Sequence, residues 1–150
     1  MPSIDTVDSL EIAAPAQALF DLVIDYPRMR EWYPRYRVEV IGGGDVVEGA
    51  RLSHELAAPG SPIKSRFTRT IKRIEPPKSI EESYDDGDLV GKGRWEFEAL
   101  APDLTRVSFY CQVRSNTWLM HIGFALGGER GHNMVYQQIL AALGQRVEAS

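Results

Sequence analysis

The feature that most constrains the fold is a change in hydrophobic period along the chain. Between about Tyr36 and Arg114, apolar residues recur at every second position, in runs separated by turn-forming segments such as Pro76-Pro77 and Asp85-Asp86-Gly87-Asp88. Such alternation is typical of antiparallel strands that bury one face. Near the C-terminus the spacing changes to three and four residues, which predicts a helix of about four turns. The residues with this spacing are Val135, Ile139, Ala142, Leu143 and Val147.

A strand and two short helices are expected before the strand-rich region. Residues Ser3 to Ile12 alternate between two faces, as in a strand. Ala14-Pro15 ends that strand and can open a helix, because proline is tolerated at the first helical position, and apolar residues from Ala16 to Val23 then follow a helical spacing. A second short helix is expected over Arg28 to Trp32, before Pro34 ends it.

These elements predict a single α+β domain over residues 1–150. A chain of this length suits one hydrophobic core. An antiparallel sheet with one apolar face must cover that face, and the C-terminal helix is the only predicted element large enough to do so. We therefore expect a curved antiparallel sheet of about seven strands around a long C-terminal helix, with the two short helices after the first strand.

Charge and hydropathy narrow the classes of partner. The formal net charge is -4, which argues against sequence-independent binding of nucleic acid, because such binding needs a dense basic face. A modest basic cluster near one hairpin is better explained as a solvated strand face, and it comprises Lys64, Arg66, Lys72, Arg73 and Lys78. No secretory signal pattern and no apolar stretch of membrane-spanning length is visible, so we expect a cytoplasmic protein without stable membrane insertion.

Cysteine, histidine and glycine patterns argue against metal and nucleotide sites. The single cysteine, Cys111, excludes an intramolecular disulfide and a four-cysteine zinc site, and its apolar surroundings favour a small buried group. His121 and His132 lack the spacing of metal ligands. Gly42-Gly43-Gly44 indicates a turn, because it does not follow the strand–Gly-x-Gly-x-x-Gly–helix pattern of nucleotide sites. We predict no metal and no cofactor.

Several short stretches, taken in their order and spacing, point to a known family. They are Ile12-Ala13-Ala14-Pro15-Ala16, Leu19-Phe20-Asp21-Leu22-Val23, Asp25-Tyr26-Pro27 with Trp32, Gly93-Arg94-Trp95-Glu96-Phe97, Thr105-Arg106-Val107 and the closing helix. From about Ile4 to Val147 the chain resembles the START-related superfamily, also called SRPBCC, and its polyketide cyclase/dehydratase and coenzyme Q-binding branches most of all. The resemblance implies a helix-grip fold with an apolar cavity between sheet and helix. It implies no particular reaction, because the superfamily has no shared catalytic signature.

Polar residues on the inward face are the candidates for ligand contact or catalysis. Strand alternation places His54, Arg69, Glu82 and Tyr84 on the same face as the apolar residues. An arginine on a buried face needs a partner. Arg69 is therefore interpreted either as part of an internal ion pair, as a charge that reaches solvent at the sheet edge, or as a group that orients a ligand. The Pro76-Pro77 reversal places it opposite Tyr84 or Asp86.

Each of the other three polar candidates also has two interpretations. His54 is either a general acid or base or a hydrogen-bonded core histidine. Glu82 is either an acid with a raised pKa or the partner of Arg69 or Arg73. Tyr84 either donates to a ligand carbonyl or places its hydroxyl at the cavity rim.

Apolar residues of the strands and the last helix would form the core and also the wall of any cavity. The predicted ligand contacts are Phe67, Trp95, Phe97, Phe109, Val135 and Ile139, together with the polar His54, Arg69 and Tyr84. The apolar, glycine-rich segment from Trp118 to Gly131 is interpreted as a lid over the cavity mouth or as an ordinary loop packed on the helix.

Three functions follow as hypotheses. The first is binding or carriage of an apolar small molecule, such as a lipid, an isoprenoid quinone or a polyketide-like aromatic. The second is a cyclase or dehydratase acting on an enolisable carbonyl compound, with acid–base groups from His54, Arg69, Glu82 and Tyr84. The third is RNA contact, because some coenzyme Q-binding relatives resemble ribosome-directed toxins, and it would need a basic surface.

Overall fold

The sheet is the main element of the fold, which we describe from a computed structural model. The structure describes residues 3–57, 64–117 and 128–148. In chain order the elements are β1 (Ser3–Ile12), α1 (Ala16–Ile24), the short 3-10 helix η1 (Tyr26–Glu31), β2 (Tyr36–Val40), β3 (Arg51–Ala57), β4 (Lys64–Glu75), β5 (Ser79–Gly87), β6 (Leu89–Ala101), β7 (Leu104–Ser115) and α3 (Gly128–Glu148). The strands form one seven-stranded antiparallel sheet in the order β1-β7-β6-β5-β4-β3-β2.

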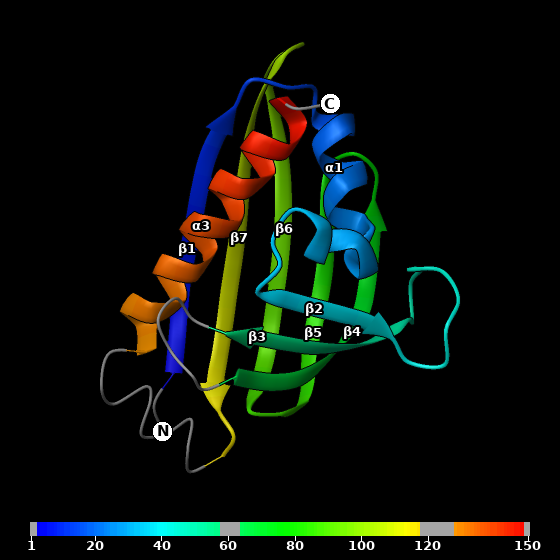
Figure 1. Ribbon diagram of the computed structural model, residues 1–150, viewed down its shortest axis with the longest axis vertical. Helices are drawn as coiled ribbons and strands as arrows, with labels where there is room; N and C mark the ends of the chain where they lie inside the picture. The colour runs from blue at the N-terminus through cyan, green and yellow to red at the C-terminus, as the bar shows by residue number, and fades with distance from the viewer. Residues whose placement is uncertain (1–2, 58–63, 118–127, 149–150) are drawn as a thin grey trace.

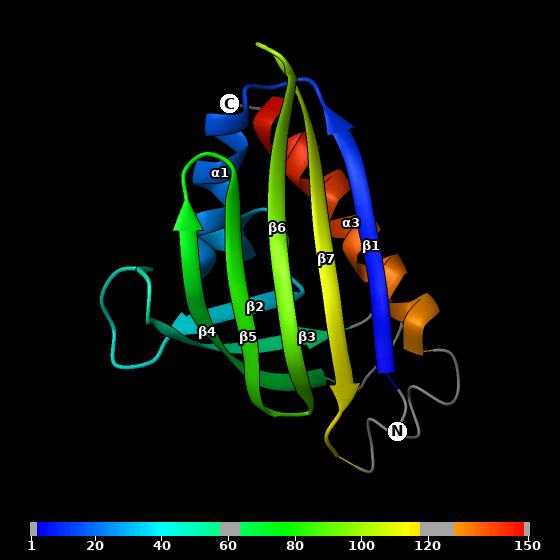
Figure 2. The same ribbon diagram turned by 180° about the vertical axis from the view of Figure 1, so that it is seen from behind.

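The helices α1 and α3 and the short η1 lie on one face of this sheet. Figure 1 shows α3, in orange and red, running along that face in front of β1 and β7, and α1 near the C-terminal end of α3. Seen from behind, the strands form the opposite face (Figure 2). The sheet curves strongly, because β2 and β3 cross the direction of β5 to β7 at a steep angle in both views. The predicted α+β fold, a curved seven-stranded sheet around a C-terminal helix, is confirmed.

The strand pairing brings together the inward residues that alternation indicated. Trp95 pairs with Phe109 and Phe97 with Val107 across the β6–β7 hairpin, as expected for cross-strand aromatic and branched pairs. Across β4 and β5, Arg69 pairs with Tyr84, one of its two predicted neighbours.

Two register shifts bend β4 on either side of Arg69 to Ile71. They fall between Thr68 and Arg69 and between Ile71 and Arg73. A β-bulge of this kind bends its strand and increases the local twist. The bend lies next to Arg69, so the local irregularity of the strand helps to aim that side chain under the helices.

The closing helix is longer than its apolar periodicity predicted. It starts at Gly128 and has 21 residues, because its first turns consist of glycine and polar residues that carry no apolar spacing. The last four residues of the predicted lid segment, 128–131, are therefore helical. The rest of that segment, 118–127, lies outside the described residues.

Candidate functional site

A buried ion pair lies at the centre of the inner face. Arg69 of β4 is 1% exposed and Glu82 of β5 is 2% exposed. The Arg69 Nη1 donates to Glu82 Oε2 at 2.6 Å. On the other carboxylate oxygen, Glu82 accepts a hydrogen bond from the hydroxyl of Tyr26 in η1. The internal ion pair, one of the three interpretations of Arg69, is thus present, and a ligand-orienting role for Arg69 stays a prediction.

Tyrosine hydroxyls from several elements surround the Arg69 guanidinium. Its Nη2 donates to the Tyr84 hydroxyl at 2.5 Å and to the Tyr136 hydroxyl of α3 at 2.9 Å. Burial raises the pKa of Tyr36 on β2, and the neighbouring Arg69 and Tyr136 act against that shift. The thiol of Cys111 on β7 lies 3.7 Å from the Tyr84 hydroxyl. One charged group therefore links β2, β4, β5 and the closing helix through short polar contacts.

His54 extends this network toward β3. Its Nδ1 lies 2.7 Å from the Tyr36 hydroxyl, and the residue is 2% exposed. The imidazole stacks on Phe67 with ring centroids 5.0 Å apart, and Phe67 in turn stacks on Tyr84 at 5.3 Å. The Arg69 Cζ lies 4.3 Å from the centroid of Tyr84, within cation–π range. These contacts make the predicted inward residues of β3, β4 and β5 one continuous group.

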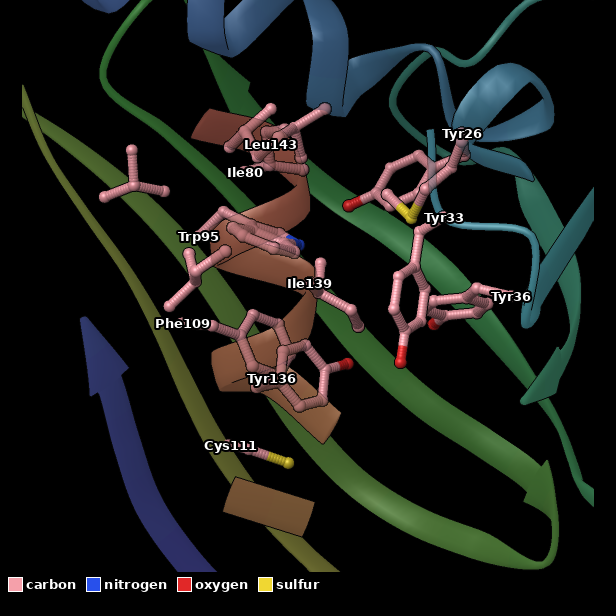
Figure 3. Close-up of a cluster of buried hydrophobic side chains, with 14 of the residues drawn as sticks. Tyr26, Tyr33, Tyr36, Ile80, Trp95, Phe109, Cys111, Tyr136, Ile139 and Leu143 are labelled. Atoms are coloured by element: carbon pink, nitrogen blue, oxygen red, sulfur yellow. The ribbon is translucent and has the colours of Figure 1, made fainter. Parts of the chain in front are cut away.

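Aromatic and aliphatic side chains of β6, β7 and α3 pack around Arg69 and its hydrogen-bond partners. Phe109 of β7 stacks on Tyr136 of α3 at 4.2 Å, and Trp95 of β6 lies 4.9 Å from Phe109. Ile139 is fully buried on the same helix face (Figure 3). Phe97, by contrast, has its ring contacts with Trp95 and with Phe20 of α1, at the α1 end of the core. Val135 is buried on α3.

A glycine on β6 permits the close packing of this wall. A Cβ at Gly93 would lie 3.1 Å from ring atoms of both Phe109 and Tyr84. Such distances are shorter than ordinary contacts of a side chain, so two rings approach the strand here because residue 93 carries no side chain.

Burial sets the protonation of the ionisable groups. Desolvation, assisted by the charge of Arg69, holds the pKa of His54 well below its usual range, so the imidazole is neutral. Burial lowers the pKa of Arg69, but the oxygens of Tyr136, Tyr36 and Tyr84 outweigh it and leave that pKa above its ordinary value. Burial raises the pKa of Glu82 above its ordinary value. The Arg69 guanidinium in contact acts in the opposite direction and favours the carboxylate, so the pair carries opposite charges at neutral pH.

This arrangement has defined chemical capabilities. A permanently charged guanidinium beside tyrosine hydroxyls can stabilise an oxygen atom that carries or develops negative charge. The neutral imidazole of His54 and the carboxylate of Glu82 are both groups that can accept a proton. The Cys111 thiol is a poor nucleophile, because burial raises its pKa to about 12.

The sequence alone did not identify three tyrosines of the cluster. In the sequence, Tyr26 stands out only within the Asp25-Tyr26-Pro27 stretch of the family resemblance, and Tyr36 only as the start of the strand-rich region. Tyr136 lies beside Val135 and one turn before Ile139 and Leu140, on the buried side of α3. A signal was available, because a tyrosine on an inward face is an apolar body with a polar tip that needs a partner.

Two of the hollows among the described residues are lined mainly by outward side chains and also by parts of the inward residues. One of about 380 Å³ is lined by Arg37, Glu55 and Arg66, with His54 and Phe67 also on its wall. Another of about 460 Å³ is lined by Lys72 and Tyr110, with Glu82 and Cys111 also on its wall. Lys64 and Arg66 of the basic cluster both pair with Glu55, which compensates part of its charge. The predicted cavity beneath α3 stays a prediction.

Within residues 3–57, 64–117 and 128–148, no three His, Cys, Asp or Glu side chains gather as metal ligands would. No helix in these ranges combines the length and hydropathy needed to cross a membrane.

Known proteins resemble this chain in sequence and in fold. The uncharacterized protein Rv0088 of Mycobacterium tuberculosis is 34% identical over 110 residues, which is 67% of this chain and 43% of that protein. The chain thus spans less than half the length of this curated relative. A START superfamily protein from Mycobacterium smegmatis superimposes with a TM-score of 0.76 at 17% identity, covering 97% of both chains. The Zhui aromatase/cyclase from a Streptomyces species gives 0.70 at 14% identity, covering 97% of this chain and 96% of that one.

The match to a family extends over almost the whole chain. Residues 3–148 fit the family described as polyketide cyclase / dehydrase and lipid transport. That span includes the seven strands, α1 and α3 of the described residues. It also includes the Arg69 cluster, which comprises Tyr26, Tyr36, His54, Arg69, Glu82, Tyr84 and Tyr136. The chain therefore belongs to the polyketide cyclase / dehydrase and lipid transport family.

Proposed function

We propose that the chain binds a small, largely apolar molecule between the sheet and α3, with the Arg69 cluster facing the polar end of that molecule. The observation that carries this proposal is the fully buried Arg69–Glu82 pair with its surrounding tyrosines, inside a wall of Phe67, Trp95 and Phe109. Sites for small molecules combine such an apolar wall with a few polar groups that orient the ligand. Lipids, isoprenoid quinones and polyketide-like aromatics all fit this description.

Occupation of this site can be tested with a pair of variants on one helix. Ile139→Trp enlarges a fully buried side chain that faces Tyr136 and the sheet, whereas Met134→Trp makes the same kind of change at a position that is 47% exposed. We expect native mass spectrometry with solvent extraction to show a bound apolar molecule in the wild type and in Met134→Trp, and loss of it in Ile139→Trp. Equal occupancy in both variants would place the ligand elsewhere, and an empty wild type would contradict the proposal.

A second candidate function is catalysis of cyclisation or dehydration. It is favoured by the contact of Arg69 with two tyrosine hydroxyls close to the neutral His54, because enolisation of a carbonyl needs a stabilised oxyanion and a proton acceptor. Turnover of a short poly-β-ketone would be compared for the wild type, Arg69→Ala and His54→Ala. Equal product in all three would remove these residues from any mechanism.

We also propose that the chain forms a single domain and that it is located in the cytoplasm. We infer that residues 1–150 act as one domain, because β1 and α3 are held together by hydrogen bonds from Thr6 to Asn133 and from Gln137 to Asp8.

A cytoplasmic location is proposed because Cys111 is a buried free thiol, as suits a reducing compartment. Cell fractionation tests the location.

A further inference from the structure

Three buried nitrogen atoms around the cluster have no hydrogen-bond partner among the described residues. They are His54 Nε2, Arg69 Nε and Trp95 Nε1, and the three residues are at most 2% exposed. Arg69 Nε and Trp95 Nε1 each carry a hydrogen and can only donate. A buried donor without an acceptor costs free energy, so each of these atoms is a position where a ligand atom would be stabilised.

We assign His54 Nε2 as a third donor, with the Tyr36 hydroxyl donating to His54 Nδ1. Arg69 can only donate, so the Tyr136 oxygen accepts from it. The Tyr36 hydroxyl lies 2.7 Å from His54 Nδ1 and is placed to donate to it. A neutral imidazole that accepts at Nδ1 carries its hydrogen on Nε2.

The three donors surround the same group of aromatic rings. His54 and Arg69 both lie over Phe67, at 5.0 Å between ring centroids and 5.2 Å from Cζ to the ring. Arg69 Cζ is also 5.6 Å from the Phe109 ring, against which Trp95 packs. Figure 3 shows the ring nitrogen of Trp95 turned toward the side of the core that holds Tyr26 and Tyr33.

One unpartnered acceptor of the inner face lies apart from this group. It is Asp8 Oδ2 on β1, whose other carboxyl oxygen accepts from Gln137. In the sheet, β7, β6 and β5 separate β1 from the β4 strand of Arg69. Asp8 therefore supplies a matched control, since it is a buried polar group of the same face but belongs to a different contact.

We propose that the ligand meets these donors with a neutral accepting oxygen, so that the site prefers a ketone or quinone carbonyl to the corresponding alcohol or phenol. A carbonyl oxygen has two lone pairs for the donors and no hydrogen of its own to place. A hydroxyl brings a hydrogen that would need an acceptor. A neutral oxygen is favoured over a carboxylate because Glu82 already balances the charge of Arg69. This inference rests on the proposed binding of an apolar molecule at the same site.

A matched set of ligands tests the preference. Fluorene, 9-fluorenol and 9-fluorenone share a ring system and differ in one carbon that bears CH₂, CH–OH or C=O. Indane, 1-indanol and 1-indanone repeat the comparison at a smaller size. We expect the ketone to bind about tenfold more tightly than its alcohol and its hydrocarbon, as measured by quenching of tryptophan fluorescence. Equal affinities within a set would overturn the inference while leaving apolar binding intact. Binding of no member of either set would contradict the proposed function and the inference with it.

Two variants and one spectroscopic measurement identify the atoms responsible. His54→Phe keeps the ring that stacks on Phe67 and removes the donor, so the ketone preference should fall several-fold, whereas Asp8→Asn should leave it unchanged. Nitrogen-15 NMR of the wild-type histidine side chains reads the tautomer of His54 directly and needs no ligand. A His54 with its hydrogen on Nδ1 would overturn the assignment of Nε2 as a donor, and an unchanged preference in His54→Phe would exclude His54 from the selection.

Discussion

Removing the charge of Arg69 should leave Glu82 as an isolated buried carboxyl group, and this makes a quantitative prediction. Burial raises the pKa of Glu82 above its ordinary value of 4.5, and the Arg69 guanidinium opposes that shift. In Arg69→Met, no guanidinium opposes this effect. Above pH 4.5, and until the raised pKa is reached, the folded variant then binds one more proton than the unfolded chain, so its stability falls as the pH rises. Each pH unit in this interval adds up to about 1.4 kcal/mol to the cost of keeping the carboxyl group protonated, which makes about 2–3 kcal/mol between pH 5 and pH 7.

The assay is urea unfolding followed by tryptophan fluorescence at pH 5 and pH 7. Relative to the wild type, whose pair stays charged over this range, Arg69→Met should lose about 2–3 kcal/mol more at pH 7 than at pH 5. The double variant Arg69→Met/Glu82→Leu should recover most of the loss and its pH dependence, because an apolar pair of similar volume can replace a buried ion pair.

A control on the same strand separates this effect from a general loss of charge. Arg66 pairs with Glu55 at 3.2 Å, but its side chain is 74% exposed, so Arg66→Met should change stability little and without pH dependence. A loss in Arg69→Met that is the same at both pH values within about 0.5 kcal/mol would refute the reasoning. It would mean that water or another group compensates Glu82 when the guanidinium is absent.

Three further predictions concern neighbouring residues. Burial and Arg69 hold the pKa of His54 well below 6.5, so below pH 6.5 only the unfolded chain takes up this proton. The unfolding free energy of the wild type should therefore fall by about 1.4 kcal/mol for each pH unit below 6.5, relative to His54→Phe. Parallel curves of unfolding free energy against pH for the two proteins would disprove this. Gly93→Ala should cost about 1–3 kcal/mol in denaturant unfolding, because the added methyl group meets the rings of Tyr84 and Phe109 at 3.1 Å, and an unaffected midpoint would show that the rings move freely. Phe109→Ala, at a fully buried position, should cost about 3–5 kcal/mol, against less than about 0.5 kcal/mol for Val7→Ala, which is 50% exposed; similar losses would argue against this core.

The face on which each candidate residue lies was determined by the sequence alone. Side chains in a strand alternate with a period of two, so His54, Arg69 and Glu82 had to share a face with their apolar neighbours once the strands were recognised. The reversal at Pro76-Pro77 then limited the cross-strand neighbour of Arg69 to two residues, and Tyr84 is the one observed. These conclusions depend on local geometry, which periodicity describes well.

The partners of Arg69 were decided by the tertiary structure. Tyr26 and Tyr136 come from helices that precede and follow most of the sheet, and Tyr136 is 67 residues from Arg69 along the chain. A hydrogen bond requires its two atoms to lie within a few tenths of an ångström of the right separation. That separation depends on the curvature of the sheet, the bulges of β4 and the position of α3, which are properties of the whole packed core. The period of a strand specifies which way a residue points and carries no information about what it meets there.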